Sequence, residues 1–335
     1  MKNYIKLTQK TINGILTINK NINMNDIKSI HINNIKMEDL NREYDIYASD
    51  YEDLICDIVI ELNKPIDCYL LFYNCQDIIT IDLSNFDTSN TTNMHGMFYC
   101  CENLTSITFG NNFNTSKVTS MHGMFEGCYN LISLDLTHFD TSNVINMGFM
   151  SRCCSALTSL ELSNFNTSKV TNMGSMFEGC SGLTSLELSN FNTSKVTSMH
   201  GMFKYCESLT ELDLHNFSTS NVIYMFAMFY NCNKLDSLDL SSFDTSKVKY
   251  MTGMFYNCKS LTSLNLNNFN MLNVSNMDGV FACCNNIKTL NIKNIKINDK
   301  ELSKFLEEIK NIQNVILNPK NNLSLYRKLK EVRYK

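Results

Sequence analysis

The sequence repeats at a nearly constant interval, and cysteine marks each repeat. Nine cysteines are separated by 26 residues seven times and by 27 residues once: Cys75, Cys101, Cys128, Cys154, Cys180, Cys206, Cys232, Cys258 and Cys284. Self-similarity with a period of about 20 to 50 residues indicates a solenoid, in which each coil buries its apolar face only against its neighbours. The pattern therefore predicts one elongated repeat domain for most of the 335-residue chain.

Each repeat contains two different spacings of apolar residues. Leu183, Leu186 and Leu188 fit a short strand whose leucines face inward. Further along the repeat, Val196, Met199, Met202, Phe203, Cys206 and Leu209 recur in steps of mainly three, which favours a short helix or 3-10 segment. The Phe-Asn-Thr-Ser sequence that joins the two parts suits a turn and a helix N-cap. We predict an α/β repeat, with a parallel sheet on one face and short helices or 3-10 turns on the other.

The strand spacing extends beyond the cysteines and gives about twelve rungs. The expected strand starts are residues 27, 55, 78, 104, 131, 157, 183, 209, 235, 261, 287 and 312. We expect residues 1–26 to form an N-terminal cap hairpin with a type I′ turn at Asn13-Gly14. The solenoid then covers residues 27–297, with regular repeats over 71–292. Residues 298–335 are expected to form a C-terminal cap with an amphipathic helix, the last strand and a short basic helix.

Composition and charge exclude several classes of function. The formal net charge is −4, and no polybasic stretch is present, so we expect no nucleic-acid partner. No run of apolar residues approaches the 18 or so that a membrane-spanning helix needs, so we expect no membrane insertion. The first residues contain no uninterrupted apolar segment, and the chain is expected to be soluble and monomeric.

Residues 71–292 resemble a known repeat family. Leu-x-x-Leu-x-Leu is the strand signature of leucine-rich repeats, and Met202-Phe203-x-x-Cys206-x-x-Leu209 leads into the next strand. This combination is similar to the BspA-like leucine-rich-repeat proteins of mycoplasmas, spirochaetes and other host-associated organisms. The resemblance implies a leucine-rich-repeat solenoid and a non-enzymatic cell-surface or secreted protein that acts in adhesion or binds host proteins. A cytoplasmic location is the alternative, since the start shows no export signal.

The regular columns of cysteine, methionine, histidine and threonine favour structural roles. Column cysteines point towards the core, where a free thiol behaves as a small hydrophobic group. The methionines of the Met-x-x-Met sequences are likewise expected to fill the core. His95, His122 and His200 occupy one slot, and we expect them to be solvated. The column that includes Thr193 is expected to cap turns. We expect no catalytic residues, no metal ligands and no cofactor, and we expect that the protein is not an enzyme.

One exposed column is the candidate binding site. The residue between the two inward leucines of each strand points to solvent, and six of these residues are acidic: Asp82, Asp135, Glu161, Glu187, Asp213 and Asp239. Neighbouring strands lie about 4.8 Å apart, so we expect these carboxylates to raise one another's pKa values. The alternative is that this column only keeps an exposed sheet soluble.

The favoured function is a protein-binding scaffold that contacts a partner protein, such as a host protein, through this acidic face. An intracellular interaction scaffold is the alternative, and a cation- or glycan-binding surface is the second alternative.

Overall fold

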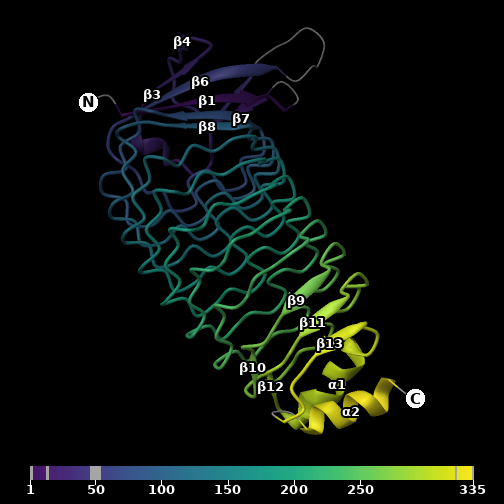
Figure 1. The fold of residues 1–335 in the computed structure, drawn as a ribbon. Coiled ribbons are helices and arrows are strands. Elements are labelled where there is room, and N and C mark those ends of the chain that lie inside the picture. The colour runs from purple at the N-terminus through teal and green to yellow at the C-terminus, as the bar shows by residue number, and fades with distance from the viewer. Residues whose placement is uncertain (1–2, 13–14, 46–53, 321–322, 334–335) are drawn as a thin grey trace.

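The protein is a repeat solenoid of about nine turns with a parallel sheet and few helices. The computed structural model describes residues 3–12, 15–45, 54–320 and 323–333. The coils are stacked along one long axis, and the two ends of the chain lie at opposite ends of the stack (Figure 1). The repeat architecture predicted from the cysteine interval is confirmed, whereas the count of twelve rungs is wrong.

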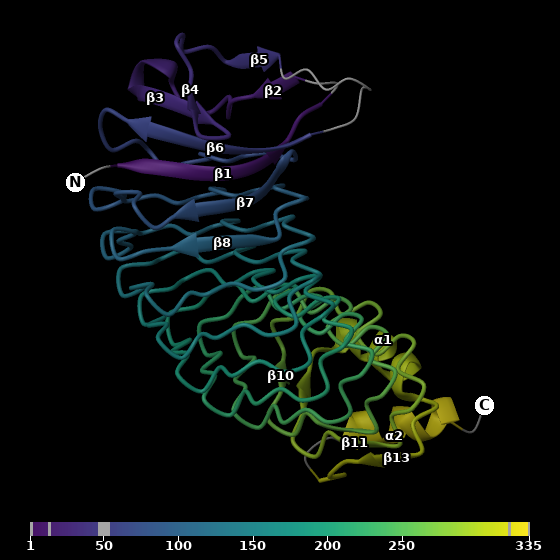
Figure 2. The same cartoon turned by 90° about the horizontal axis from the view of Figure 1, so that it is seen from above.

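The N-terminal end is an antiparallel sheet that joins the solenoid. It contains β1 (Tyr4–Lys10), β3 (Ile27–Ile32), β4 (Ile35–Lys36) and β6 (Ile55–Leu62). Outside this sheet, β2 (Ile15–Thr17) pairs with β5 (Glu43–Asp45), and η1 (Met24–Asp26) is a short 3-10 helix. Strand β1 lies antiparallel between β6 and β7 (Ile78–Leu83), and β7 pairs in parallel with β8 (Ser106–Phe109) (Figure 2). The first strand of the chain therefore connects the antiparallel cap to the first parallel strands.

The strands expected to begin rungs at residues 27 and 55 are antiparallel instead. Strand β3 pairs with β6 and folds back on β4 through Asn33 and Asn34, both of which have positive φ. Alternation of apolar side chains indicates a strand with one buried face. The same alternation occurs in parallel and in antiparallel strands, so it does not predict which of the two forms. Ile12 and Ile15 exchange both backbone hydrogen bonds, but the expected turn at Asn13-Gly14 lies outside the described residues.

The parallel sheet is present at the two ends of the solenoid and interrupted between them. Beyond β7 and β8, parallel pairing resumes in β9 (Ser263–Asn265), β11 (Thr289–Asn291) and β13 (Asn314–Ile316), and β10 (Asn270–Met271) pairs with β12 (Lys296–Ile297). Residues 110–262, all of them described, contain no strand, although their leucines are buried in the core. A sheet continuous through every coil was therefore a wrong expectation.

The segment with three-residue spacing consists of consecutive β-turns and not of a helix. Met97, Tyr99 and Cys101 donate their N–H groups to the carbonyls three residues earlier, those of Met94, Gly96 and Phe98. Gly96 and Cys100 have φ values of 57° and 55°. Positive φ at the third position is the mark of a type II turn, and it ends helical geometry at that residue. Of the short helices or 3-10 turns expected on this side of the solenoid, the helices are therefore absent from residues 94–101, which form turns.

The remaining N–H groups of these turns bond to the next coil. Gly96 and Phe98 donate to the carbonyls of His122 and Met124 at 2.9 and 2.8 Å, and the same pattern recurs from coil to coil. Isolated parallel bridges continue this contact from Asn93 to Asn276. Rows of hydrogen-bonded peptide groups thus run along the solenoid, and the N–H groups of the turns point towards its C-terminal end. We call this side of the molecule the turn face.

Both ends of these rows have side-chain partners. At the N-terminal end, the side-chain amides of Asn19 and Asn21 donate to the carbonyls of Leu71 and Tyr73 at 2.8 and 3.1 Å. At the C-terminal end, the carboxylate of Glu308 accepts the N–H groups of the last coil. Terminal coils of a solenoid need such caps because no further coil satisfies their backbone groups.

Side chains of the cysteine and threonine columns form hydrogen bonds between neighbouring coils. The buried thiol of Cys206 donates to the carbonyl of Phe177 at 3.1 Å, and equivalent bonds link the other column cysteines from Cys101 onwards. The buried hydroxyl of Thr193 donates to the carbonyl of Ser218 and accepts from its N–H, at 2.9 and 2.8 Å. The threonines therefore act mainly between coils, and turn capping within a coil was too narrow an expectation.

The C-terminal end is covered by two helices. Helix α1 (Asp299–Ile309) begins after Asn298, whose side chain accepts the N–H of Glu301 at 3.0 Å. Its buried face includes Leu302, Phe305 and Ile309. Strand β13 follows, and α2 (Leu323–Arg333) packs against α1 (Figure 1).

Candidate functional site

The six predicted acidic residues lie in equivalent positions of their coils. Glu187, for example, lies between Leu186 and Leu188, which are both buried, and its own side chain is exposed. Asp135, Glu161, Asp213 and Asp239 are exposed in the same way. Asp82 differs because it is half-buried and pairs with Lys6 at 3.3 Å. We call the side of the solenoid that carries this column the acidic strand face.

Backbone hydrogen bonds hold the carboxylates in place. In each case, a carboxylate oxygen accepts the N–H group of the residue two positions further along the chain. The donor is Ser163 for Glu161, Ser189 for Glu187 and Ser241 for Asp239, at 3.0, 2.9 and 2.9 Å. Local hydrogen bonds of this kind are typical of aspartate in turns, and here glutamate makes them as well. The negative charges are thus positioned before any ligand arrives.

In four exposed members of the column these bonds lower the pKa, which is the opposite of what we expected. The hydroxyl and the N–H of Ser163 lower the pKa of Glu161, and Ser189 does the same for Glu187. The pKa of Asp213 is lowered by the N–H and the ring of His215, and that of Asp135 is lowered by Thr137. Repulsion between neighbouring carboxylates is the smaller effect because these side chains are fully or almost fully solvated.

A hollow of about 540 Å³ lies on the acidic strand face. Four carboxylates line it, those of Glu187, Glu211, Asp213 and Asp239, together with serines and the two leucines of the adjoining coils. Glu211 was missed in the sequence because its equivalents in other coils are serine or threonine, so no acidic column points to it. A second hollow of about 430 Å³ continues the face towards Asn265 and Asn291.

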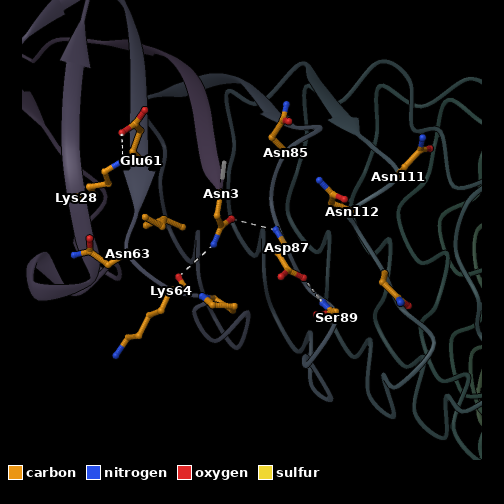
Figure 3. A pocket seen from close by; sticks show the side chains of 13 residues that line it. Asn3, Lys28, Glu61, Asn63, Lys64, Asn85, Asp87, Ser89, Asn111 and Asn112 are labelled. Atoms are coloured by element: carbon orange, nitrogen blue, oxygen red, sulfur yellow. Dashed lines mark hydrogen bonds and ion pairs between the residues drawn. The ribbon is translucent and has the colours of Figure 1, made fainter. Parts of the chain in front are cut away.

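A different cavity of about 590 Å³ lies between the antiparallel cap and the first coils. Figure 3 shows Asn3 at its centre, where its side chain donates to the carbonyl of Lys64 and accepts the N–H of Asp87. Lys28 and Glu61 form an ion pair at one side, at 3.3 Å. Sequence analysis could not find this cavity, because β1 brings together parts of the chain that no repeat relates.

The three histidines that share one slot of the repeat pack against other aromatic rings. The rings of His95 and His122 stack with their centroids 4.9 Å apart, and the ring of His200 packs against Phe226 at 5.0 Å. These rings are half-buried, so they are less solvated than expected. The described residues contain no group of three or more His, Cys, Asp or Glu side chains that could hold a metal ion. Within the same part of the chain, no helix is long and apolar enough to cross a membrane.

Comparison with protein families gives one result. A family model described as "Mycoplasma protein of unknown function, DUF285" matches four overlapping segments, residues 66–185, 150–262, 183–295 and 213–317. These segments cover the regular coils and the first C-terminal helix. No curated protein matches the chain.

Proposed function

Because the chain belongs to the mycoplasma repeat family of unknown function DUF285, its function has to be argued from geometry, and we propose a protein-binding scaffold. The partner binds along the acidic strand face, and the protein has no catalytic role. The observation that supports this proposal most directly is the hollow lined by Glu187, Glu211, Asp213 and Asp239. It combines a concave surface with four carboxylates and no basic lining residue.

The chemistry of this face suits a basic, extended segment of a partner protein. Carboxylates on successive coils form a row with one negative charge for each coil from Asp135 to Asp239. Lysine and arginine side chains of an extended peptide can reach neighbouring positions in such a row. Attraction between solvated charges mainly accelerates association and selects against acidic partners, and salt screens it strongly.

We further propose that the protein acts at the cell surface or outside the cell, in adhesion or contact with host proteins. The resemblance of residues 71–292 to BspA-like leucine-rich-repeat proteins supports this location. Protease added to intact cells tests it: degradation of the protein supports a surface location. Protection until the cells are lysed supports the alternative, an intracellular interaction scaffold.

A fluorescent oligolysine peptide tests the acidic strand face directly. We expect the intact protein to bind this peptide with an affinity that falls steeply with salt, and to bind an oligoglutamate peptide far more weakly. The triple variant Glu161→Lys, Glu187→Lys and Asp213→Lys should lose binding. Its circular dichroism spectrum should be unchanged, because all three side chains are exposed.

The matched control carries the same change in charge elsewhere. Glu102→Lys, Glu207→Lys and Glu307→Lys lie outside the column, and this triple variant should keep at least half of the wild-type affinity. Equal loss of binding in the two triple variants would show that only net charge matters, and the proposed site would be wrong.

A further inference from the structure

The turn face carries a column of side chains that alternate in charge. The column contains one residue from each of eight successive coils: Tyr73, Tyr99, Glu126, Arg152, Glu178, Lys204, Tyr230 and Tyr256. Arg152 contacts Glu126 at 2.9 Å and Glu178 at 3.2 Å, and Lys204 contacts Glu178 at 3.1 Å. The tyrosines stack in pairs at the two ends of the column. We call this set the charge column.

The charge column is complementary to itself when its order is reversed. A reversed copy places Arg152 opposite Glu178 and Glu126 opposite Lys204. The same reversal places Tyr99 opposite Tyr230 and Tyr73 opposite Tyr256. Every charge then faces an opposite charge, and every tyrosine faces a tyrosine. Arg152 and Lys204 are the more exposed of these charges, because the side chains of Glu126 and Glu178 are buried. The midpoint of this relationship lies between the coil of Arg152 and the coil of Glu178.

Two neighbouring columns on the turn face share this midpoint over the four central coils. One of them contains His122, Gly148, Gly174 and His200, so that reversal places glycine opposite glycine and histidine opposite histidine. The other contains Ser120, Asn146, Asn172 and Ser198, which reversal matches in the same way. The match ends beyond these four coils, because reversal then places His95 opposite Phe226 and Asn93 opposite Tyr224.

Stacking of the coils turns this sequence relationship into a geometric one. The coils bond to one another through the same backbone groups throughout, so the columns run side by side along the solenoid. Consider a two-fold axis that lies in the plane of the turn face, perpendicular to the long axis of the solenoid and midway between these two coils. Rotation about this axis produces a second copy whose coils run in the opposite order. Each column of the second copy then faces the same column of the first. Such an axis generates an isologous dimer with antiparallel solenoids.

The turn face also has the surface character of an interface. Gly148 and Gly174 are buried because neighbouring side chains cover them: His122 and Asn172 lie over Gly148, and the ring of His200 lies over Gly174. Towards one end lie large exposed aromatic residues, among them Tyr224 and Phe226, which are 42% and 37% exposed. Aromatic residues and arginine are enriched at protein interfaces.

We propose that the turn face binds a second copy of this chain, antiparallel to the first, about a two-fold axis between the coils of Arg152 and Glu178. This dimer takes the place of the monomer expected from the sequence. It uses a face different from the acidic strand face and does not depend on the function proposed for that face.

Two complementary charge reversals test the dimer. In the proposed dimer, residue 126 of each copy faces residue 204 of the other copy. Lys204→Glu therefore places glutamate opposite glutamate at both of these contacts, and Glu126→Lys places lysine opposite lysine. By analytical ultracentrifugation at about 100 µM, a concentration at which weak specific contacts form, we expect a wild-type dimer and two monomeric variants. An equimolar mixture of the two variants should form a heterodimer, because each glutamate then faces a lysine.

The mixture separates the interface from effects within one chain. Both variants also lose an ion pair between neighbouring coils of their own chain, and mixing cannot restore that pair. Circular dichroism should show that each variant is folded, and Lys247→Glu, outside these columns, should leave the dimer intact. A wild-type protein that stays monomeric at this concentration would overturn the proposal. A wild-type dimer that either variant leaves unchanged, or that the mixture fails to restore, would also overturn it.

Discussion

The carboxylate of Glu308 accepts the N–H groups of Gly279 and Phe281, at 2.8 and 3.1 Å. In every earlier coil, the equivalent N–H groups donate to two carbonyls of the next coil. Glu308 belongs to helix α1, so one side chain of the C-terminal cap takes the place of two backbone acceptors that an additional coil would supply. This contact is the clearest reason why the rows of hydrogen bonds can end where they do.

Removal of this acceptor should destabilise the C-terminal end. We expect Glu308→Ala to lower the free energy of unfolding by about 2 to 4 kcal/mol, because two backbone N–H groups lose a charged partner. Glu308→Gln keeps one acceptor oxygen and should have an intermediate effect. Urea denaturation measures the loss, and hydrogen exchange at Gly279 and Phe281 locates it. Glu307→Ala is the control, since Glu307 is exposed and pairs with Lys310 on the surface of the same helix end. Equal stability of all three variants would contradict the capping role.

The threonine column should depend on its hydroxyl and not on its shape. Thr193→Val keeps the volume but removes the donor and the acceptor for Ser218 in the next coil. Both backbone groups of Ser218 then lack these bonds, so we expect a loss of about 1 to 3 kcal/mol in urea denaturation. Thr193→Ser keeps the hydroxyl and should cost less than Thr193→Val. The reverse order would mean that the methyl group and its packing matter more.

Thiol reactivity should divide the 14 cysteines sharply. Burial raises the pKa of Cys180 to about 12 and raises the pKa of Cys206 well above its ordinary value. Cys283 is exposed. Because the thiolate is the reactive form, iodoacetamide should label Cys283 in the native protein and leave Cys180 and Cys206 unlabelled until the protein is denatured. Peptide mass spectrometry measures this, and early labelling of Cys206 would show that the coils open.

The acidic strand face should keep its charge in moderately acidic solution. The pKa values of Glu161, Glu187 and Asp213 are lowered, so these groups stay ionised until the pH falls below the ordinary values for carboxylates. Oligolysine binding should therefore persist as the pH falls from neutral and disappear only below about pH 4. Fluorescence anisotropy at constant ionic strength measures this profile. Loss of binding well above that pH, with circular dichroism unchanged, would mean that mutual repulsion dominates after all.

The sequence predicted the repeat and its register well. The recurrent cysteine and the paired leucines are buried in the regular coils as predicted, because each coil meets the same neighbours, whereas Asp82 and the column histidines are half-buried and not exposed. The acidic column follows from that register. Its lowered pKa values do not, because they depend on backbone N–H groups such as that of Ser189, which residue spacing does not reveal.

Two parts of the fold could not be derived from residue spacing. The three-residue spacing of Met199 and Met202 is equally typical of a helix and of consecutive turns, and only the conformation of Gly201 and its equivalents distinguishes them. The glycine in Met-His-Gly-Met was the available signal for positive φ. The position of β1 between β6 and β7 depends on pairing between distant segments, for which a single sequence has no signal.

Since each coil presents the same donors to the next coil and the same acceptors to the previous one, a whole coil can be inserted or deleted without altering either cap. Length is therefore the property of this fold that is easiest to vary among related chains. A coil added between the coils of Arg152 and Glu178 would move the two halves of the turn face apart equally. A coil added near either end would leave the centre of symmetry unchanged and lengthen the solenoid on only one side of that centre.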